Sequence, residues 1–503
     1  MYKAINAVLS YIKKYPILIL ILVVGWLVNL NFFFPIKGNI GHDSIYVYFI
    51  VIPLLYVISL SFLVIYFGIR QNKSIFYIGP LTFFVFLATP FSYLLSWYKR
   101  GTPFFGFNYP TAMQSPSALT NLSYALTVLV LFMILIILEE KKRKPIHSLL
   151  LGFFVGLGFG LKFYGGIILG CIVGIHELLF FLQKKNLKNF IVLVGSGVLF
   201  LALSVLLFYD PFRSVKSGAI FALVPFAIPN TLVEDPDALY IPQLVMSRYF
   251  LLSLHKFSLR LIIIEFITTA IYLVYNFGTR IIGLFYLVKQ CIQKKLNIFD
   301  WTLIITICFS VALTVALIQR GGDWWNTVQF FGYGLLLLNF FAAAAIYNLS
   351  RFNKKLSIII FILIIVLTMP LNVELLIRAG ERIEKRYDIS LDEQKALAFL
   401  KTRQDNGTIL SVPLFSNLSY IPARSGKPVF FADENVISNL GIRYEERKKL
   451  LSNLKDLNLS RLSVKYFYLV KSDKDYPVMI DKVRNTPELK NIYDNPDVII
   501  YAR

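Results

Sequence analysis

Apolar runs of about twenty residues recur along most of this chain, and they constrain its fold more than any other feature. An α-helix needs a run of that length to cross the hydrocarbon core of a bilayer. Because 57% of the 503 residues are hydrophobic, the chain also carries more apolar side chains than a soluble core would bury. The sequence therefore predicts an all-α polytopic membrane bundle.

Short basic clusters separate the apolar runs and give each predicted span a direction. Lys13 and Lys14 precede the first run, and the cluster at 141–144 is the strongest. Lys and Arg concentrate on the cytoplasmic side of membranes, so we expect a multi-pass protein of the cell membrane with a cytoplasmic N-terminus and about eleven spans. The expected spans are 17–34, 46–66, 75–97, 118–138, a helical hairpin at 149–182, 191–208, one span within 251–292 after an interfacial helix, 301–318, 330–347 and 356–376.

Charge and cysteine usage exclude several other classes. The net charge of +22 does not indicate a nucleic-acid partner, because most Lys and Arg residues lie between apolar runs. Cys171, Cys291 and Cys308 all lie in apolar segments, which argues against a disulfide framework or a thiolate metal site. The four histidines are far apart and show no metal-ligand spacing. We therefore expect no cofactor and assign no metal ligand, while dependence on a divalent ion stays open.

The composition changes near residue 378, which divides the chain into a membrane domain at 1–378 and a second domain at 379–503. The second part mixes charged and apolar residues, and we expect it to be a small extracytoplasmic α/β domain. Ser390 and Glu393 have the spacing of a capping box before a helix at 391–401. Short apolar segments predict strands at 408–412, 428–431, 464–470 and 498–501.

The loop between the first two runs contains the first carboxylate of the chain, Asp43, which directly follows His42. In the predicted topology this acid lies at the outer membrane face. A charge there is costly unless it is solvated or used, so Asp43 is a functional candidate. The alternative is that Asp43 and Ser44 only cap the helix that follows.

Other polar residues are expected beside the outer ends of spans, where a phosphate headgroup could meet a cation while its lipid tail stays in the bilayer. The candidates for substrate binding are His42, Lys162, Tyr164, Arg248, Arg320, Asp323, Trp324 and Gln329. Lys162 either extends to the interface along its apolar stem or reaches into a site. Paired tryptophans are typical of an interfacial belt, whereas the glycines at 321–322 would let a ligand approach the backbone closely.

Four short motifs are notable: Gly41-His42-Asp43-Ser44, Gly160-Leu161-Lys162-Phe163-Tyr164, Thr327-Val328-Gln329-Phe330-Phe331 and Asn495-Pro496-Asp497-Val498-Ile499-Ile500-Tyr501. In these motifs the chain resembles the GT-C superfamily of polytopic glycosyltransferases, in particular its bacterial members with a C-terminal extracytoplasmic domain. The resemblance implies a GT-C-like bundle and a polyprenyl-phosphate sugar donor. It also implies that Asp43 acts as the base in an inverting transfer to an acceptor, which is a glycan, a lipid or a protein. Lys162, Arg248 or Arg320 would then stabilise the leaving phosphate.

Two other classes of function compete with this hypothesis. A transporter or flippase of lipid-linked sugars would use the same cations without a base, but matching discontinuous helices are not evident in the two halves of the chain. A non-enzymatic membrane scaffold with an outer binding domain would have to keep charged residues at span ends without a ligand. The sequence therefore favours an enzyme that acts on a lipid-linked sugar at the outer membrane face.

Overall fold

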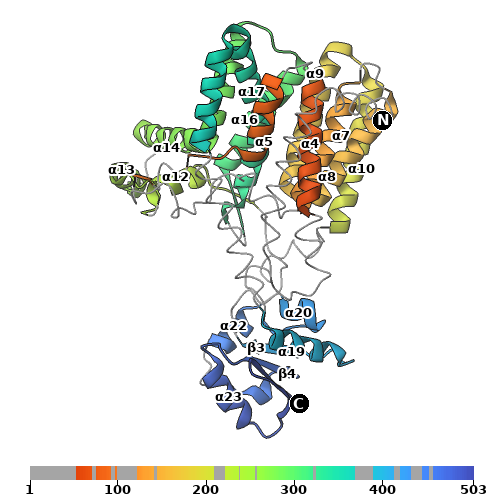
Figure 1. Ribbon diagram of the computed structural model, residues 1–503, viewed down its shortest axis with the longest axis vertical. Coiled ribbons are helices and arrows are strands. Elements are labelled where there is room, and N and C mark those ends of the chain that lie inside the picture. Colours follow the sequence, from red (N-terminus) through yellow and green to blue (C-terminus); the bar gives the residue numbers. More distant parts are fainter. Residues whose placement is uncertain are drawn as a thin grey trace. The chain divides into compact units, whose positions relative to one another are not determined.

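The structure, a computed structural model, describes residues 52–70, 75–91, 97–98, 122–140, 144–208, 221–236, 238–254, 258–320, 324–368, 389–412, 420–431, 444–452 and 457–503. The predicted first span at 17–34, together with His42, Asp43 and Asp323, lies outside the described residues. The chain divides into two compact units, a helical one that ends near residue 383 and a C-terminal one that begins at 384. Residues 320–324 group with the C-terminal unit. Figure 1 shows helices throughout the first unit and a small sheet in the second.

The helical unit is that of a multi-pass membrane protein. Within the described residues, 5 helical segments are long and apolar enough to cross a bilayer: Phe163–Lys184, Leu187–Phe208, Leu259–Ile292, Ile298–Ala316 and Trp324–Phe352. Shorter apolar helices cover Leu54–Gly68, Ile75–Leu87, Ser123–Leu138 and Pro145–Leu161. A further apolar helix occupies 354–368. The prediction of about eleven spans, which rests on the charge pattern, stays a prediction.

Helix α17 (Val328–Phe352) is the centre of this unit. Its side chains are buried at Val328 and from Phe330 through Ala343. It packs against α5 (Ile75–Leu87), α15 (Ile281–Ile292) and α16 (Ile298–Ala316). The ring of Phe67 in α4 (Ile52–Arg70) stacks on Phe340 with the ring centroids 3.6 Å apart. Of the 5 candidate spans among the described residues, the one that contains α17 is the most deeply enclosed by the rest of the unit.

The predicted hairpin at 149–182 is confirmed as two helices, α8 (Pro145–Leu161) and α9 (Phe163–Lys184), that meet at Lys162. They pack closely and antiparallel, because a Cβ added to Gly166 would lie 2.2 Å from Phe159 Cα and one added to Gly170 would lie 3.6 Å from the Val155 side chain. Helix α10 (Leu187–Phe208) then turns back and runs parallel to α8 (Figure 1). Small residues let these backbones approach, as is common between membrane helices.

Between α10 and α16 the chain forms a short hairpin and a group of helices. Strand β1 (Phe221–Leu223) pairs antiparallel with β2 (Leu317–Gln319), so the span expected at 301–318 ends as a helix at Ala316. Helices α12 (Ala227–Glu234) and α13 (Pro242–Ser253) pack on α14 (Leu259–Phe277). Segment 251–292 was expected to hold an interfacial helix before a span. The structure has a candidate span at Leu259–Ile292 that is interrupted at η4 (Gly278–Arg280), and the interfacial helix stays a prediction. Figure 1 shows α14 at a steep angle to α16 and α17.

The C-terminal unit is a four-stranded mixed sheet with helices on both faces. Its strands are β3 (Ile409–Val412), β4 (Tyr466–Val470), β5 (Lys490–Asp494) and β6 (Val498–Ala502), in the order β3-β4-β6-β5. Only the β3 and β4 pair is parallel. Phe467 and Leu469 face the core beneath α23 (Tyr476–Arg484), and Tyr466 and Tyr468 face the core beneath α19 (Leu391–Thr402). Successive side chains of β4 point to opposite faces of the sheet, so this strand contributes residues to both hydrophobic cores.

Three of the four predicted strands in this unit are confirmed as β3, β4 and β6. The segment at 428–431 contributes only an isolated bridge, in which Val429 pairs with Ile409. Ser390 caps α19 as expected, because its Oγ accepts a hydrogen bond from Glu393 N at 3.0 Å. The Glu393 carboxylate instead accepts hydrogen bonds from the hydroxyls of Tyr468, at 3.1 Å, and Tyr420.

Candidate functional site at one end of the helical unit

Lys162 occupies the point where α8 ends and α9 begins. Its backbone is extended, and its N–H donates to Gly158 O at 2.9 Å while its carbonyl accepts from Gly166 N at 2.8 Å. Lys144 precedes the first residue of α8 and Lys184 ends α9, so these two cations lie at the opposite end of the hairpin. Lys162 is thus set apart from the basic residues that flank the hairpin.

Tyr164, the second residue of α9, follows Lys162 by two positions and is fixed in place by neighbours distant in sequence. Its hydroxyl donates a hydrogen bond to Gln319 Oε1 at the end of β2. Its ring packs edge to face on Phe330, with the centroids 5.0 Å apart, and also contacts Phe221 of β1. The structure therefore brings α9, the β1–β2 hairpin and the start of α17 together around Tyr164.

Gln329 lies at the start of α17, next to the Phe330 ring that packs on Tyr164. Its side-chain nitrogen donates to Asn326 Oδ1 at 3.3 Å, whereas its buried Oε1 has no hydrogen-bond partner among the described residues. An unsatisfied buried acceptor is costly and is uncommon in native proteins. Lys162, Tyr164 and Gln329 therefore lie at one end of the helical unit, as a cation, a hydroxyl and an unpaired amide oxygen.

Arg248 is held by acidic partners of its own. Its Nη1 lies 2.8 Å from Glu234 Oε1 and its Nε lies 2.8 Å from Glu265 Oε1. The second Glu265 oxygen accepts from Asn230 Nδ2 at 2.7 Å, and Tyr249 donates to Glu234 at 3.2 Å. Two carboxylates offset the charge of Arg248, so this group links α12, α13 and α14 and leaves little positive charge for a phosphate.

Arg320 and Trp324 belong to the C-terminal unit, unlike Lys162 and Tyr164. Both side chains are exposed. Trp324 begins a short 3-10 helix, η5 (Trp324–Thr327). Their predicted role in a shared site with Lys162 stays a prediction.

Arg280 is a charged residue that the sequence reasoning passed over. It lies in η4 and is only 2% exposed. Its Nε donates to Asn339 Oδ1 at 2.9 Å and its Nη2 to Ala88 O at 2.6 Å, but its Nη1 has no partner within the part of the chain that the structure describes. A signal was present, because an ionisable residue inside an apolar segment is a functional candidate in its own right. Gln319 carried no comparable signal, since its contact with Tyr164 spans 155 positions.

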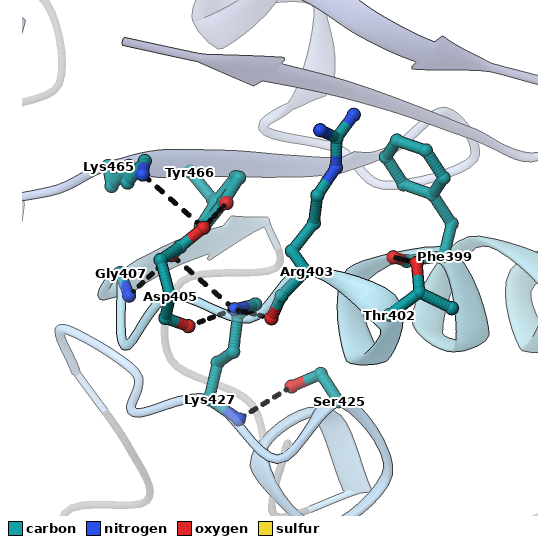
Figure 2. Close-up of polar contacts among 9 residues, drawn as sticks. All are labelled: Phe399, Thr402, Arg403, Asp405, Gly407, Ser425, Lys427, Lys465 and Tyr466. Atoms are coloured by element: carbon teal, nitrogen blue, oxygen red, sulfur yellow. Dashed lines mark hydrogen bonds and ion pairs between the residues drawn. The ribbon is translucent and has the colours of Figure 1, made fainter.

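A cluster of charged residues in the C-terminal unit surrounds Asp405 (Figure 2). Its carboxylate accepts from the Tyr466 hydroxyl at 2.5 Å and from Gly407 N at 2.8 Å, and Lys465 Nζ lies 3.3 Å away. Buried Lys427 lies 3.4 Å from the same carboxylate and also donates to the Asp405 carbonyl. The hydrogen bond from Tyr466 is the main cause that holds the pKa of Asp405 far below its usual range. Every one of these groups has a partner, which indicates a structural cluster.

No protein-family model matches this chain, and a search of curated proteins also finds no match.

Proposed function

We propose that this protein is an integral membrane glycosyltransferase, which moves a sugar from a polyprenyl-phosphate donor to an acceptor at the outer membrane face. The observation that carries the proposal is the position of Lys162, at the opposite end of the α8–α9 hairpin from Lys144 and Lys184. By the positive-inside rule those two cations mark the cytoplasmic side, so Lys162 would lie at the outer side. There it can meet a lipid phosphate.

The chemistry follows from the residues assigned to the site. Asp43 accepts the acceptor proton as the acceptor attacks the anomeric carbon, and polyprenyl phosphate leaves with its bonding electron pair. Lys162 stabilises the negative charge that develops on the departing phosphate. Tyr164, bonded to Gln319, and the unpaired Oε1 of Gln329 offer hydrogen bonds to sugar hydroxyls near that cation.

The test is sugar transfer by purified protein in proteoliposomes, supplied with a panel of radiolabelled decaprenyl-phosphate sugars and an acceptor fraction from membranes. We expect release of decaprenyl phosphate to fall by about two to four orders of magnitude in Asp43→Asn, because that change removes the base while keeping the side-chain size. Binding of the donor should change little in this variant.

Lys162→Ala should weaken donor binding, since a charge-assisted contact to phosphate is lost. Lys185→Ala is the matched control, because Lys185 is an exposed lysine at the other end of α9. Sugar transfer at the parental rate in Asp43→Asn would show that Asp43 is not the catalytic base. Equal affinities for the donor in Lys162→Ala and Lys185→Ala would show that Lys162 does not bind the donor phosphate.

A further inference from the structure

Helix α13 carries its one charged side chain on the side that faces the protein. This residue is Arg248, and its guanidinium lies 2.8 Å from a carboxylate oxygen of Glu234 in α12 and from one of Glu265 in α14. The Arg248 side chain is only 16% exposed. A helix on the surface of a soluble protein has its charged residues on the outward face, where water solvates them. The polarity of α13 is the reverse, which indicates that its outward face does not meet water.

The outward face of α13 is apolar. Its exposed large side chains, with exposed fractions from 40% to 69%, are Leu252, Tyr249, Phe250 and Met246. Residues 246, 249, 250 and 253 are three or four positions apart, so they share one side of the helix. The exposed polar residues of α13, Gln243 and Ser253, are uncharged. A contiguous apolar patch of this kind marks a surface that contacts a protein or a membrane.

Exposed apolar side chains continue along the chain into α14, on which α13 packs. Leu254 directly follows α13 and Leu259 begins α14, and both are exposed. Phe266, next to the Glu265 that binds Arg248, is 74% exposed. Because α14 opens the candidate membrane span Leu259–Ile292, the medium around its exposed apolar side chains is lipid. The same medium suits the apolar face of α13.

Tyr249 indicates the depth at which the helix lies. Its hydroxyl donates to Glu234 at 3.2 Å, while its ring is exposed on the apolar face. Tyrosines of membrane proteins concentrate at the headgroup level, where the ring meets apolar surroundings and the hydroxyl finds a polar partner. The position of Tyr249 therefore favours lipid over a second protein as the partner of this face.

We infer that α13 lies in the membrane interface, with Met246, Tyr249 and Phe250 inserted among the lipids and with Arg248 holding the helix on the bundle. Interfacial helices often carry Lys or Arg on the polar face, which attract anionic headgroups. The one cation of α13 is already offset by two carboxylates, so the apolar face alone anchors the helix. The interfacial helix that the sequence predicts within 251–292 would then begin earlier, at Pro242. The inference rests on α12, α13 and α14, so it holds or fails independently of glycosyl transfer.

Nitroxide labelling can measure the depth of α13 in the full-length protein. The native Cys171, Cys291 and Cys308 are replaced by Ser, and a spin label is attached at Phe250→Cys or, as a second reading of the same face, at Met246→Cys. The proteins are placed in nanodiscs of neutral phosphatidylcholine, with or without anionic phosphatidylglycerol. Saturation of the EPR signal with oxygen, which partitions into lipid, and with a water-soluble nickel chelate then gives the depth of each label.

We expect both labels to lie about 5–10 Å below the headgroup boundary, as for the apolar face of an interfacial helix. Phe266→Cys on α14 is the control for lipid contact, and Lys401→Cys at the end of α19 is the control for water contact. The depth should be the same with and without phosphatidylglycerol, because the charge of Arg248 is already paired within the protein.

Each of three other results would overturn the inference. Labels at 246 and 250 that are as accessible to the nickel chelate as the label at 401 would show that this face meets water. Labels that are shielded from both reagents would show that protein covers the face. Insertion that requires phosphatidylglycerol would show that charge, and not the apolar face, attaches the helix to the membrane.

Discussion

The Ser204 hydroxyl donates a hydrogen bond to the Gly156 carbonyl at 2.6 Å and so joins α10 to α8. Ser196 makes the equivalent contact to Ser148 O at 3.3 Å, and both pairs are 48 residues apart. The constant separation shows that the two helices run parallel and in register. Because Gly156 lacks a side chain, its backbone can approach Phe200 closely enough for this seam to form.

Filling this seam should destabilise the helical unit. A Cβ at Gly156 would lie 2.7 Å from the carbonyl oxygen of Phe200, so Gly156→Val requires a backbone shift. Overpacking of this kind typically costs about 1–3 kcal/mol, which should lower the thermal unfolding midpoint measured in detergent. Gly195→Val is the control, since nothing lies within 4 Å of a Cβ at that position of α10. Equal midpoints for the two variants would contradict the packing described for the seam.

The two carboxylates that hold Arg248 should differ in their contribution to stability. Glu265 is buried and bonded to both Arg248 and Asn230, whereas the Glu234 side chain is 24% exposed. Removing one partner of a buried ion pair costs about 3–5 kcal/mol, so Glu265→Gln should lower the free energy of unfolding by an amount near that range. Glu234→Gln should lower the free energy of unfolding by less, because water can reach this partly exposed position and solvate the Arg248 nitrogen that loses its partner. Chemical denaturation of both variants measures the difference, and the reverse order would refute the assignment.

The Asp405 cluster predicts a loss of local stability in acid and in alkali. The pKa of Asp405 is lowered in the folded state, so its stabilisation is complete above the ordinary value of about 4 and is lost as the pH falls below it. Burial and the Asp405 carboxylate raise the pKa of Tyr466 to about 12, so the stabilisation from its neutral form is lost as the pH rises above about 10.

Hydrogen exchange in the full-length protein, corrected for the intrinsic rate, can measure both losses at residues 403–407 and 466. Asp405→Asn should remove most of the acid dependence, and Tyr466→Phe should remove the alkaline one. Arg484→Gln is the control, because Arg484 also interacts with a tyrosine of this unit but lies outside the cluster. This variant should leave the acid and the alkaline dependence of exchange at these residues unchanged. Acid dependence that persists in Asp405→Asn would show that another group controls this region.

Cysteine labelling tests the orientation that the proposed function requires. The native Cys171, Cys291 and Cys308 would first be replaced by Ser. We expect Lys401→Cys, exposed at the end of α19, to react with an impermeant maleimide in intact cells. Lys185→Cys should react only after lysis, because the basic end of α9 is expected in the cytoplasm. The opposite pattern would reverse the topology.

Features with a local cause could be predicted from the sequence. The pair of helices around Lys162 follows from an apolar run too long for one span, interrupted by a Lys and flanked by glycines. The Ser390 cap follows from residue spacing, and β4 and β6 follow from unbroken apolar segments of a sheet that is buried on both faces.

Features that depend on distant contacts could not be predicted in this way. Strand β5 has a mostly polar sequence, since it lies at the sheet edge and pairs only with β6. The apolar pattern predicts that residues 317–318 end a span, yet residues 317–319 form a strand that pairs with β1, almost a hundred positions earlier. The partners of Arg280 lie 59 and 192 positions away, and no local pattern indicates them. The sequence therefore indicates candidate site residues by their residue type, but it does not indicate which distant residues contact them in the fold.

The strand order of the C-terminal unit sets the sequence in which its sheet can assemble. Strand β6 is synthesised after β3, β4 and β5, yet it lies between β4 and β5. Until residues 498–502 emerge from the ribosome, β5 has no partner and one edge of β4 stays open. During that interval the nascent unit therefore exposes unpaired strand edges, to which a strand of another chain can add.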